Sequence, residues 1–482
     1  MLFNSIDFAL FLPVVFILYW FITDKNLTQQ NFLVVVSSYI FYGWWDWRFL
    51  SLLLFSTLLD YSIARKLGTE NNKKRRTVIL WISILLNLGL LGVFKYYNFF
   101  LDNFIAAFTF FGTEIVASSL NIILPVGISF YTFQTLSYVI DVYNRKLEPT
   151  EDLIAFAAFV SFFPQLVAGP IERATHLLPQ FCKKRKFDYT SAVDGLRQIL
   201  WGLFKKIVIA DNCAEYANLI FNNSSSYSGS TLFLGALFFT FQIYGDFSGY
   251  SDIAIGISRL FGFDLMRNFN FPYFSRDFAE FWRRWHISLS TWFRDYLYIP
   301  LGGNRGGKLM KVRNTLIIFI VSGLWHGANW TFIVWGALNA LFVLPLILIK
   351  NNRNHLDVVA KGKYFPSIKE FLLILTTFIL TVFSWVFFRA NNLEHAISYI
   401  SVMLSSSLFT LPVFQAMREA WITLMLIVIF VSIEWVGREE QYAIAKLGFK
   451  WRRPLRYFFY YAIIAVIFWF GGKEQQFIYF QF

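Results

Sequence analysis

Residues 281–307 read FWRRWHISLSTWFRDYLYIPLGGNRGG, in which several arginines, a histidine and an aspartate stand among aromatic residues. The chain around this stretch is apolar: 57% of its 482 residues are hydrophobic and 15% are charged. Soluble globular proteins are about 45–50% apolar and about 25% charged. Because a backbone in lipid must satisfy its own hydrogen bonds, the composition predicts an all-α polytopic membrane protein. A charged and aromatic stretch within such a protein is a candidate site.

The formal net charge of the chain is +13. In a membrane protein this excess is typical of cytoplasmic loops rich in lysine and arginine, so we expect membrane lipid and no nucleic acid as a partner. The two cysteines, Cys182 and Cys213, are too few for a disulfide framework. No basic region precedes the first apolar run, so residues 8–22 are expected to form a retained helix rather than a cleaved signal.

Apolar runs follow one another along the whole chain and predict one integral-membrane domain, residues 1–482, with about 11–13 transmembrane or re-entrant helices. The candidate segments are residues 8–22, 31–60 (two helices), 77–101, 103–118, 122–142, 152–170, 192–221, 230–263 (bent), 314–349 (a broken pair), 371–390, 396–411, 420–436 and 457–472. Several segments are shorter than the ~20 residues of a simple span, which indicates re-entrant or buried elements. Only residues 350–369 read as a soluble linker.

Basic loops set the predicted orientation, because loops rich in lysine and arginine stay in the cytoplasm. These loops are residues 64–76, 183–186, 305–313, 350–369 and 438–456. The last apolar segment follows the last of these loops and therefore runs outward. The aromatic C-terminal tail, residues 473–482, is accordingly expected to be extracytoplasmic.

His326 lies in the motif SGLWHGANWTFIVWG, residues 322–336. It follows the basic loop that ends at Arg313 by about 20 Å of helix, and the hydrocarbon core is about 30 Å thick. Gly323 and Gly327 flank the histidine and favour a helix break there. An ionisable residue at this depth is by default a functional candidate. Spacing alone supports equally a buried histidine that only completes a helix-breaking turn.

His286 lies between Arg283 and Arg284 on one side and Arg294 on the other. On a continuous helix, Arg283, His286 and Ser290 would share one face. Arginine suits phosphate because its planar guanidinium makes paired hydrogen bonds, so this face is a candidate site for an anionic donor. The alternative is an amphipathic interfacial helix whose tryptophans lie among the lipid headgroups.

Asp246 and Asp252 stand within a mostly apolar segment, residues 241–263. Carboxylates at such a position need partners, and we expect Arg283 or Arg284 to supply them in structural ion pairs. A metal site is not expected, because zinc sites use at least three protein ligands and the chain has no HxxxH, CxxC or HExxH pattern.

Several motifs together resemble one family. They are LPVGISFYTFQTLSYVIDVY (124–143), FPQLVAGPI (163–171), QIYGDFSGYSDIAIG (242–256), FWRRWHISLSTWFRDYLYIPLGG (281–303) and SGLWHGANW (322–330). This set resembles the membrane-bound O-acyltransferase family, in the bacterial branch that includes the integral-membrane subunit of alginate O-acetyltransferase and the D-alanyl transfer protein of teichoic acid. The motifs span residues 124–330, which we interpret as the catalytic core.

The resemblance implies helices around a central tunnel or funnel in the bacterial cytoplasmic (inner) membrane. It makes His326 the match to the invariant histidine of the family and His286 the match to a second polar position. The donor would be acetyl-CoA or another acyl thioester arriving from the cytoplasm as a substrate, with no bound cofactor. Arg283, Arg284 and Arg294 would then line the donor entrance, where they suit a coenzyme A phosphate or a carrier protein.

The expected chemistry is acyl transfer from the thioester to a hydroxyl. A thioester carbonyl is already electrophilic, so the hydroxyl needs a base, and a neutral imidazole at His326 suits that role. A covalent acyl-serine at Ser322 is an alternative without further support. The sequence thus predicts an O-acetyltransferase for an exported polysaccharide, working with an extracytoplasmic transferase or esterase-like partner protein.

Two other functions stay open. One is D-alanyl transfer to teichoic acid from a carrier protein. The other is a transporter or polysaccharide export channel with proton-relay histidines, although such proteins often have paired broken helices in their two halves and none is evident here.

The tail ends in FIYFQF, residues 477–482, which is aromatic and carries no charged side chain. Such a tail is not expected to be exposed to solvent, and an anchor on the outer membrane face is the simplest interpretation. Alternatively, Tyr479 accepts the acyl group, because a phenol with a pKa of about 10 is easier to deprotonate than a sugar hydroxyl. The tail resembles the tyrosine-containing C-terminus of the small partner protein of D-alanyl transfer systems.

Overall fold

Polar residues between the apolar runs determine where helices begin. Asn26 caps α2 (Leu27–Asp46), because its side-chain oxygen accepts hydrogen bonds from two N–H groups of the first turn. Ser367 and Glu370 form a reciprocal capping box at the start of α17 (Ile368–Arg389). Both arrangements satisfy N–H groups that a first helical turn leaves unpaired.

The computed structural model describes residues 1–113, 115, 118–120, 122–472 and 475–478. Within these residues the regular structure is helical, with no strand, so the predicted all-α class is confirmed. The chain forms two compact units that alternate in sequence: unit 1 comprises residues 1–192 and 257–266, and unit 2 comprises residues 193–256 and 267–482. Two long helices, α10 (Tyr189–Leu203) and α12 (Gly229–Leu260), contribute residues to both units.

Unit 1 contains α1 (Ile6–Ile17), η1 (Leu18–Ile22), α2, η2 (Trp47–Phe49), α3 (Leu50–Thr69), α4 (Lys73–Leu91), η3 (Gly92–Tyr96), α5 (Tyr97–Phe110), α6 (Ile128–Tyr143), α7 (Leu153–Ser161), α8 (Phe163–Leu166) and α9 (Ala174–Phe181). Buried polar contacts join its helices. Asp60 of α3 is fully buried and accepts hydrogen bonds from Ser83 and Asn87 of α4. Hydrogen bonding makes the burial of such a carboxyl group tolerable in an apolar helix bundle.

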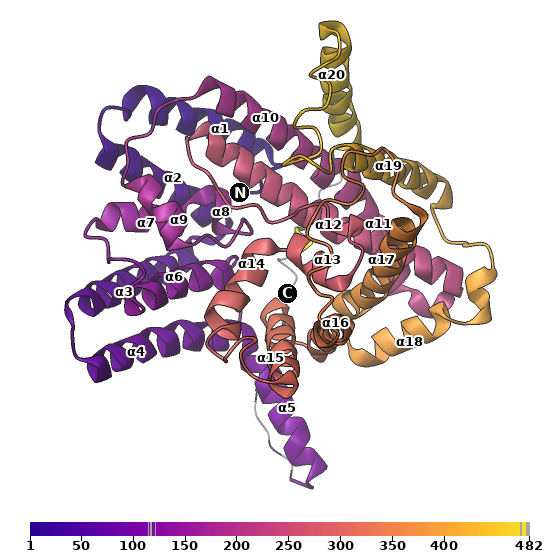
Figure 1. The fold of residues 1–482 in the computed structure, drawn as a ribbon, viewed down its shortest axis with the longest axis horizontal. Helices are drawn as coiled ribbons and strands as arrows, with labels where there is room; N and C mark the ends of the chain where they lie inside the picture. The colour runs from indigo at the N-terminus through magenta and orange to yellow at the C-terminus, as the bar shows by residue number, and fades with distance from the viewer. Residues whose placement is uncertain (114, 116–117, 121, 473–474, 479–482) are drawn as a thin grey trace. The chain divides into compact units, whose positions relative to one another are not determined.

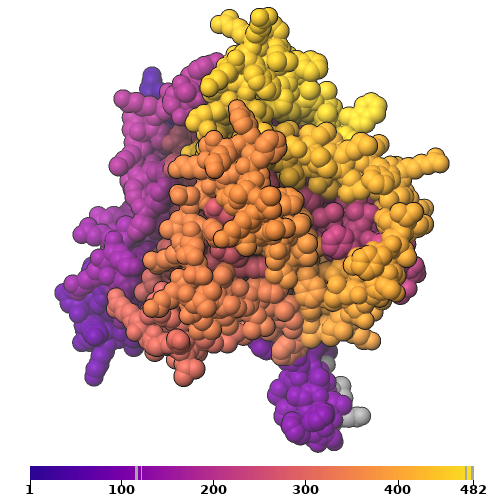
Figure 2. All heavy atoms as spheres, turned by 45° about the vertical axis from the view of Figure 1, so that its right-hand side comes forward, coloured from indigo at the N-terminus to yellow at the C-terminus, as the bar shows by residue number. Residues whose placement is uncertain are grey.

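Unit 2 contains η4 (Phe204–Ala210), α11 (Asp211–Asn222), η5 (Ser224–Ser226), most of α12, η6 (Pro272–Phe274), α13 (Phe278–Arg284), α14 (Ile287–Phe293), η7 (Arg294–Tyr298), α15 (Lys308–His326), α16 (Trp330–Leu348), α17, α18 (Leu393–Met403), η8 (Ser406–Phe409), α19 (Met417–Val436) and α20 (Arg453–Phe470). In Figure 2, segments after residue 300, coloured orange to yellow, cover much of the visible face of this unit, and magenta residues of its earlier helices show between them.

Glycines bring the backbone of α12 against η4, which is a π-helical segment. A Cβ atom added to Gly245 would lie 3.0 Å from the carbonyl oxygen of Lys205, and one added to Gly249 would lie 3.1 Å from the backbone nitrogen of Lys206. Small residues allow such close helix contact within membranes. The crossing therefore places Lys205 and Lys206 directly against α12.

The helices α15 and α16 form a tight hairpin (Figure 1). A Cβ atom added to Gly323 would lie 2.2 Å from the carbonyl oxygen of Phe332, and one added to Gly336 would lie 2.2 Å from that of Phe319. The two backbones thus touch on both sides of the turn, which confirms the predicted broken pair at 314–349.

In the part of the chain that the structure describes, four helical segments are long and apolar enough to cross a membrane: residues 73–110, 330–348, 368–389 and 417–436. Residues 6–22 form a shorter apolar helix. The segment expected at 77–101 lies within the first of these, and the segment expected at 103–118 shares it only up to residue 110. The segment expected at 396–411 contains most of the 11-residue α18 and the short η8. The polytopic helical fold is confirmed, and the number of crossings stays a prediction.

Candidate active site

A break between two short helices positions His286. Helix α13 ends at Arg284 and α14 begins at Ile287, while His286 has φ 43°, in the left-handed region that non-glycine residues rarely adopt. Asn268 holds the break, because its carbonyl oxygen accepts from Ile287 N–H at 2.9 Å and its side-chain oxygen accepts from the Ser288 hydroxyl at 2.6 Å. The prediction that Arg283, His286 and Ser290 share one face of a continuous helix is therefore wrong.

His326 is the last residue of α15, and the extended Gly327 follows it. Asn329 then caps α16 by accepting a hydrogen bond from Thr331 N–H at 3.0 Å. The sequence prediction of a helix break after His326 is confirmed.

The structure brings the two predicted histidines together in unit 2. Their ring centroids lie 6.4 Å apart with an interplanar angle of 84°, and His286 is 1% and His326 4% exposed. Trp335 stands perpendicular to the His326 ring at 5.2 Å, and Phe247 packs on the His286 ring at 4.6 Å. The imidazoles thus share an aromatic environment from which bulk water is excluded.

A cavity of about 270 Å³ lies among α13, α14, α15 and α16, and neither histidine lines it. Its walls are mostly apolar, and they include Arg283, Arg294 and Ser322. Ser322 stands one helical turn before His326 on α15. The cavity therefore combines basic side chains with a wall that reaches within one turn of the candidate base.

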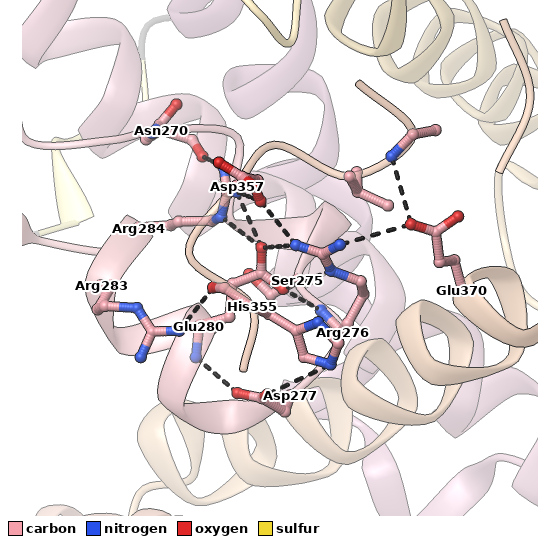
Figure 3. Close-up of polar contacts among 12 residues, drawn as sticks. Asn270, Ser275, Arg276, Asp277, Glu280, Arg283, Arg284, His355, Asp357 and Glu370 are labelled. Carbon is pink, nitrogen blue, oxygen red and sulfur yellow. Dashed lines mark hydrogen bonds and ion pairs between the residues drawn. The ribbon is translucent and has the colours of Figure 1, made fainter. Parts of the chain in front are cut away.

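Arg284 has a different environment from Arg283, as Figure 3 shows. Its guanidinium lies 2.8 Å from the carboxylate of Glu280, and Arg276 pairs with the same carboxylate at 3.0 Å. Arg284 also donates to the carbonyl oxygens of Asn270 and Asp357. It does not line the cavity, so the structure separates it from the other two predicted donor-binding arginines.

Asn352, His355 and Asp357, within the linker expected at 350–369, are hydrogen-bonded through their backbone carbonyls to arginines in and before α13 (Figure 3). Arg283 donates to the carbonyl oxygens of Asn352 at 2.7 Å and His355 at 2.8 Å, and Arg276 donates to that of Asp357 at 2.6 Å. Asn352 itself lines the cavity. Sequence reasoning missed this contribution because a backbone carbonyl acceptor has no sequence signature.

The carboxylates of α12 have partners other than the expected ones. Asp246 lies 2.9 Å from the ammonium group of Lys206, and Asp252 lies 2.5 Å from that of Lys205. The prediction that Arg283 or Arg284 pairs with them is wrong. The physical reason is the glycine crossing of α12 and η4, which places the two lysines beside α12.

The described end of the tail is buried. Phe477 is 2% and Ile478 0% exposed, and Ile478 N–H donates to Asp246 at 2.7 Å. An anchor lying on the membrane face is therefore wrong for these two residues. Tyr479 lies outside the described residues, so its role stays a prediction.

Among the other histidines, His176 of unit 1 has a structural setting. Its Nδ1 lies 2.8 Å from Glu172 and its Nε2 3.5 Å from Asp264. The side chains of Asp264 and Glu172 raise the pKa of His176 to about 10. A histidine that stays charged at neutral pH is unsuited to act as a general base. No group of three or more histidine, cysteine or acidic side chains suited to a metal ion is found in the described residues.

The family model and the related proteins that match this chain all point to the same family. A sequence profile of the membrane-bound O-acyltransferase family (MBOAT) matches residues 145–386. The chain is 40% identical to the probable alginate O-acetylase AlgI of Azotobacter vinelandii, over 92% of this chain and 86% of that protein. It is 37% identical to the peptidoglycan O-acetyltransferase of Helicobacter pylori, over 84% and 80%, and 28% identical to the teichoic acid D-alanyltransferase of Bacillus subtilis, over 57% and 71%.

Proposed function

The chain belongs to the membrane-bound O-acyltransferase family, and we propose that it moves an acetyl group from a cytoplasmic thioester across the bacterial inner membrane for O-acetylation of an exported polysaccharide. The buried pair of His286 and His326 beside a partly basic cavity carries this proposal. The relatives named as O-acetylases match more of the chain, and at higher identity, than the named D-alanyltransferase. This difference favours acetyl over D-alanyl transfer.

His326 acts as the general base in this proposal. It accepts the proton of the attacking hydroxyl while the hydroxyl oxygen forms a bond to the thioester carbonyl carbon. The carbon–sulfur bond then breaks, and the imidazolium returns the proton to the leaving thiolate. His286 stands beside this ring and is the second catalytic position. The aromatic environment excludes water, which would otherwise compete as the nucleophile.

The donor enters through the cavity of α13–α16. Its apolar walls suit the uncharged arm of an acyl thioester, while Arg283 and Arg294 suit a phosphate of coenzyme A. Arg284 is already paired with Glu280, so we assign it to holding α13 rather than the donor. A carrier protein presenting the same thioester arm is the alternative donor.

Tyr479 is the proposed first acceptor. Ile478, the residue before it, is hydrogen-bonded to Asp246, and the next residue of α12, Phe247, packs on His286. Transfer to the phenol forms an acetyl–tyrosine ester and releases the thiol. An extracytoplasmic transferase then moves the acetyl group to the polymer. Tyr479→Phe removes only the hydroxyl, so we expect it to abolish polymer acetylation at unchanged protein level. Acetylation at the wild-type rate would exclude the relay.

Thioester turnover by the purified protein tests the proposed function and separates an enzyme from a transporter. We expect release of free coenzyme A from acetyl-CoA, and we expect His326→Ala to abolish this release. His395→Ala is the matched control, since His395 is hydrogen-bonded to Ser224 and is not in the histidine pair. Equal turnover by the His326→Ala and wild-type proteins would overturn the assignment.

A further inference from the structure

A buried charge cluster lies where η4 and α11 meet α12. The ammonium group of Lys206 lies 2.8 Å from Asp211 and 2.9 Å from Asp246, and the three side chains are 2–8% exposed. Burial of ions is costly unless they are paired and their remaining hydrogen-bonding capacity is satisfied. Two carboxylates have more oxygen acceptors than one ammonium group can satisfy, so their oxygens can accept hydrogen bonds from further donors.

The C-terminal segment supplies such a donor. One oxygen of Asp246 faces Lys206, and the other accepts a hydrogen bond from the backbone N–H of Ile478 at 2.7 Å. Lys206 in turn donates to the backbone carbonyl oxygen of Gln475 at 3.2 Å. The two charged groups thus hold both ends of residues 475–478 through backbone atoms.

Apolar contacts also hold residues 475–478 in place. The ring of Phe477 packs on Tyr250 at 5.2 Å with an interplanar angle of 38°, and Tyr250 stands one helical turn after Asp246 on α12. Ile478 is completely buried. One turn of α12 therefore supplies both the polar and the apolar contacts to the end of the chain.

The same turn also contacts the candidate active site. Phe247 directly follows Asp246 and packs on His286 at 4.6 Å. Gly245 and Gly249 bracket this turn and bring it against the backbone of η4, which carries Lys206. The same turn of α12 therefore contacts both the tail and the histidine pair.

We propose that Asp246 and Lys206 are positioning residues that form a tail clamp: they bind the backbone of residues 475–478 and hold this segment beside the turn of α12 that contacts His286, as an acyl-carrying tail requires. The inference rests on the proposed function in treating the tail as the acyl carrier. The clamp itself is defined by contacts of described residues, so it can be tested without acyl transfer.

The test measures how fast a maleimide labels a cysteine in the tail. Ile478→Cys is introduced into the full-length chain together with Cys182→Ser, which removes the exposed native thiol, while the buried Cys213 reports on global unfolding. We expect slow labelling at position 478. We expect Asp246→Leu to speed it at least tenfold, because that substitution removes the acceptor for the tail and leaves Lys206 paired with Asp211.

Two matched variants separate the clamp from general stability. Asp246→Asn keeps an acceptor oxygen, so labelling is expected to stay within about threefold of the parent rate. Asp211→Asn removes the negative charge of the other carboxylate beside Lys206 while Asp246 keeps its hydrogen bond to the tail, and the same result is expected. Fast labelling in the parent, or equal rates for Asp246→Leu and the parent, would overturn the clamp.

A tail-side variant keeps the proposal testable if Asp246→Leu unfolds and exposes Cys213. In a Phe477→Cys background, Ile478→Pro deletes the N–H that Asp246 accepts, whereas Ile478→Val keeps it. We expect labelling to be at least tenfold faster with proline than with valine, and equal rates would overturn the clamp.

The clamp is independent of catalysis, so His326→Ala should leave the labelling rate of the tail cysteine unchanged. A protected tail together with full acetylation by Tyr479→Phe would leave the clamp standing and exclude the relay.

Discussion

His286 is held in a backbone conformation that a non-glycine residue rarely adopts, with φ 43°. The arginines before and after this break have different surroundings. Arg283, before the break, reaches the cavity, and so does Arg294, after it, while Arg284 points into the pair with Glu280. Neighbouring arginines therefore have different expected roles.

Arg294 tests donor binding more directly than Arg283 does, because its side chain is 60% exposed and pairs with the adjacent Asp295 at 2.8 Å. Loss of a charged hydrogen bond to donor phosphate costs about 1.5–3 kcal/mol, so we expect Arg294→Gln to raise the KM for acetyl-CoA about tenfold with little change in kcat. Steady-state kinetics on the purified protein measure both values.

Arg284→Gln is the control for this prediction. It removes one of the two arginines that pair with the buried Glu280, so the yield of folded protein should fall while the KM of the remaining enzyme is unchanged. An unchanged KM in Arg294→Gln, or a raised KM in Arg284→Gln, would contradict the assignment of these arginines.

His176 makes stability depend on pH. Its folded pKa of about 10 exceeds its ordinary value of 6.5, so its stabilising contribution is fully present below about pH 6.5 and is lost as the pH rises through about 10. The melting temperatures of wild type and His176→Gln should therefore differ most near pH 6 and converge above pH 10. A difference that grows with rising pH would be inconsistent with the pairing to Asp264 and Glu172.

At the scale of elements, the α15–α16 hairpin sets the position of His326. Gly323 has no room for a Cβ atom, since the carbonyl oxygen of Phe332 would lie 2.2 Å away. We expect Gly323→Ala to destabilise the protein by about 1–3 kcal/mol through overpacking and to lower activity by displacing His326. Denaturation of the purified protein measures the first effect.

Gly89 of α4 provides the comparison, because a Cβ atom there would meet nothing within 4 Å. Removing a glycine from a helix interior without a clash should stabilise the protein by about 0.5–1 kcal/mol. If both alanine variants shifted stability in the same direction, close contact of the α15 and α16 backbones would not be the reason for Gly323.

Local patterns allowed some elements to be predicted and not others. The helix break after His326 was predictable, because glycines and distance from a basic loop are both visible in the sequence. The lysine partners of Asp246 and Asp252 were not, because a π-helical segment about 40 residues upstream places them. The contacts of Asn352 and His355 with Arg283 were not predictable either, since the acceptors are backbone carbonyls.

At the scale of the whole molecule, the composition predicted the helical membrane fold and the motifs predicted the family, since both are spread over much of the chain. The buried end of the tail was not predictable from its aromatic sequence, because such a sequence also suits a membrane surface. Its burial depends on a cluster that Lys206, Asp211 and Asp246 form only in the folded chain.

O-acetylation of the exported polysaccharide by cells that produce only His326→Ala tests the central claim most directly. The membrane content of the variant should match that of wild type, and His395→Ala should acetylate normally. With the general base removed, we expect polymer acetylation to fall at least a hundredfold, in line with the usual contribution of such a base of about 10²–10⁴. Near-normal acetylation of the polymer by the His326→Ala cells would contradict the account.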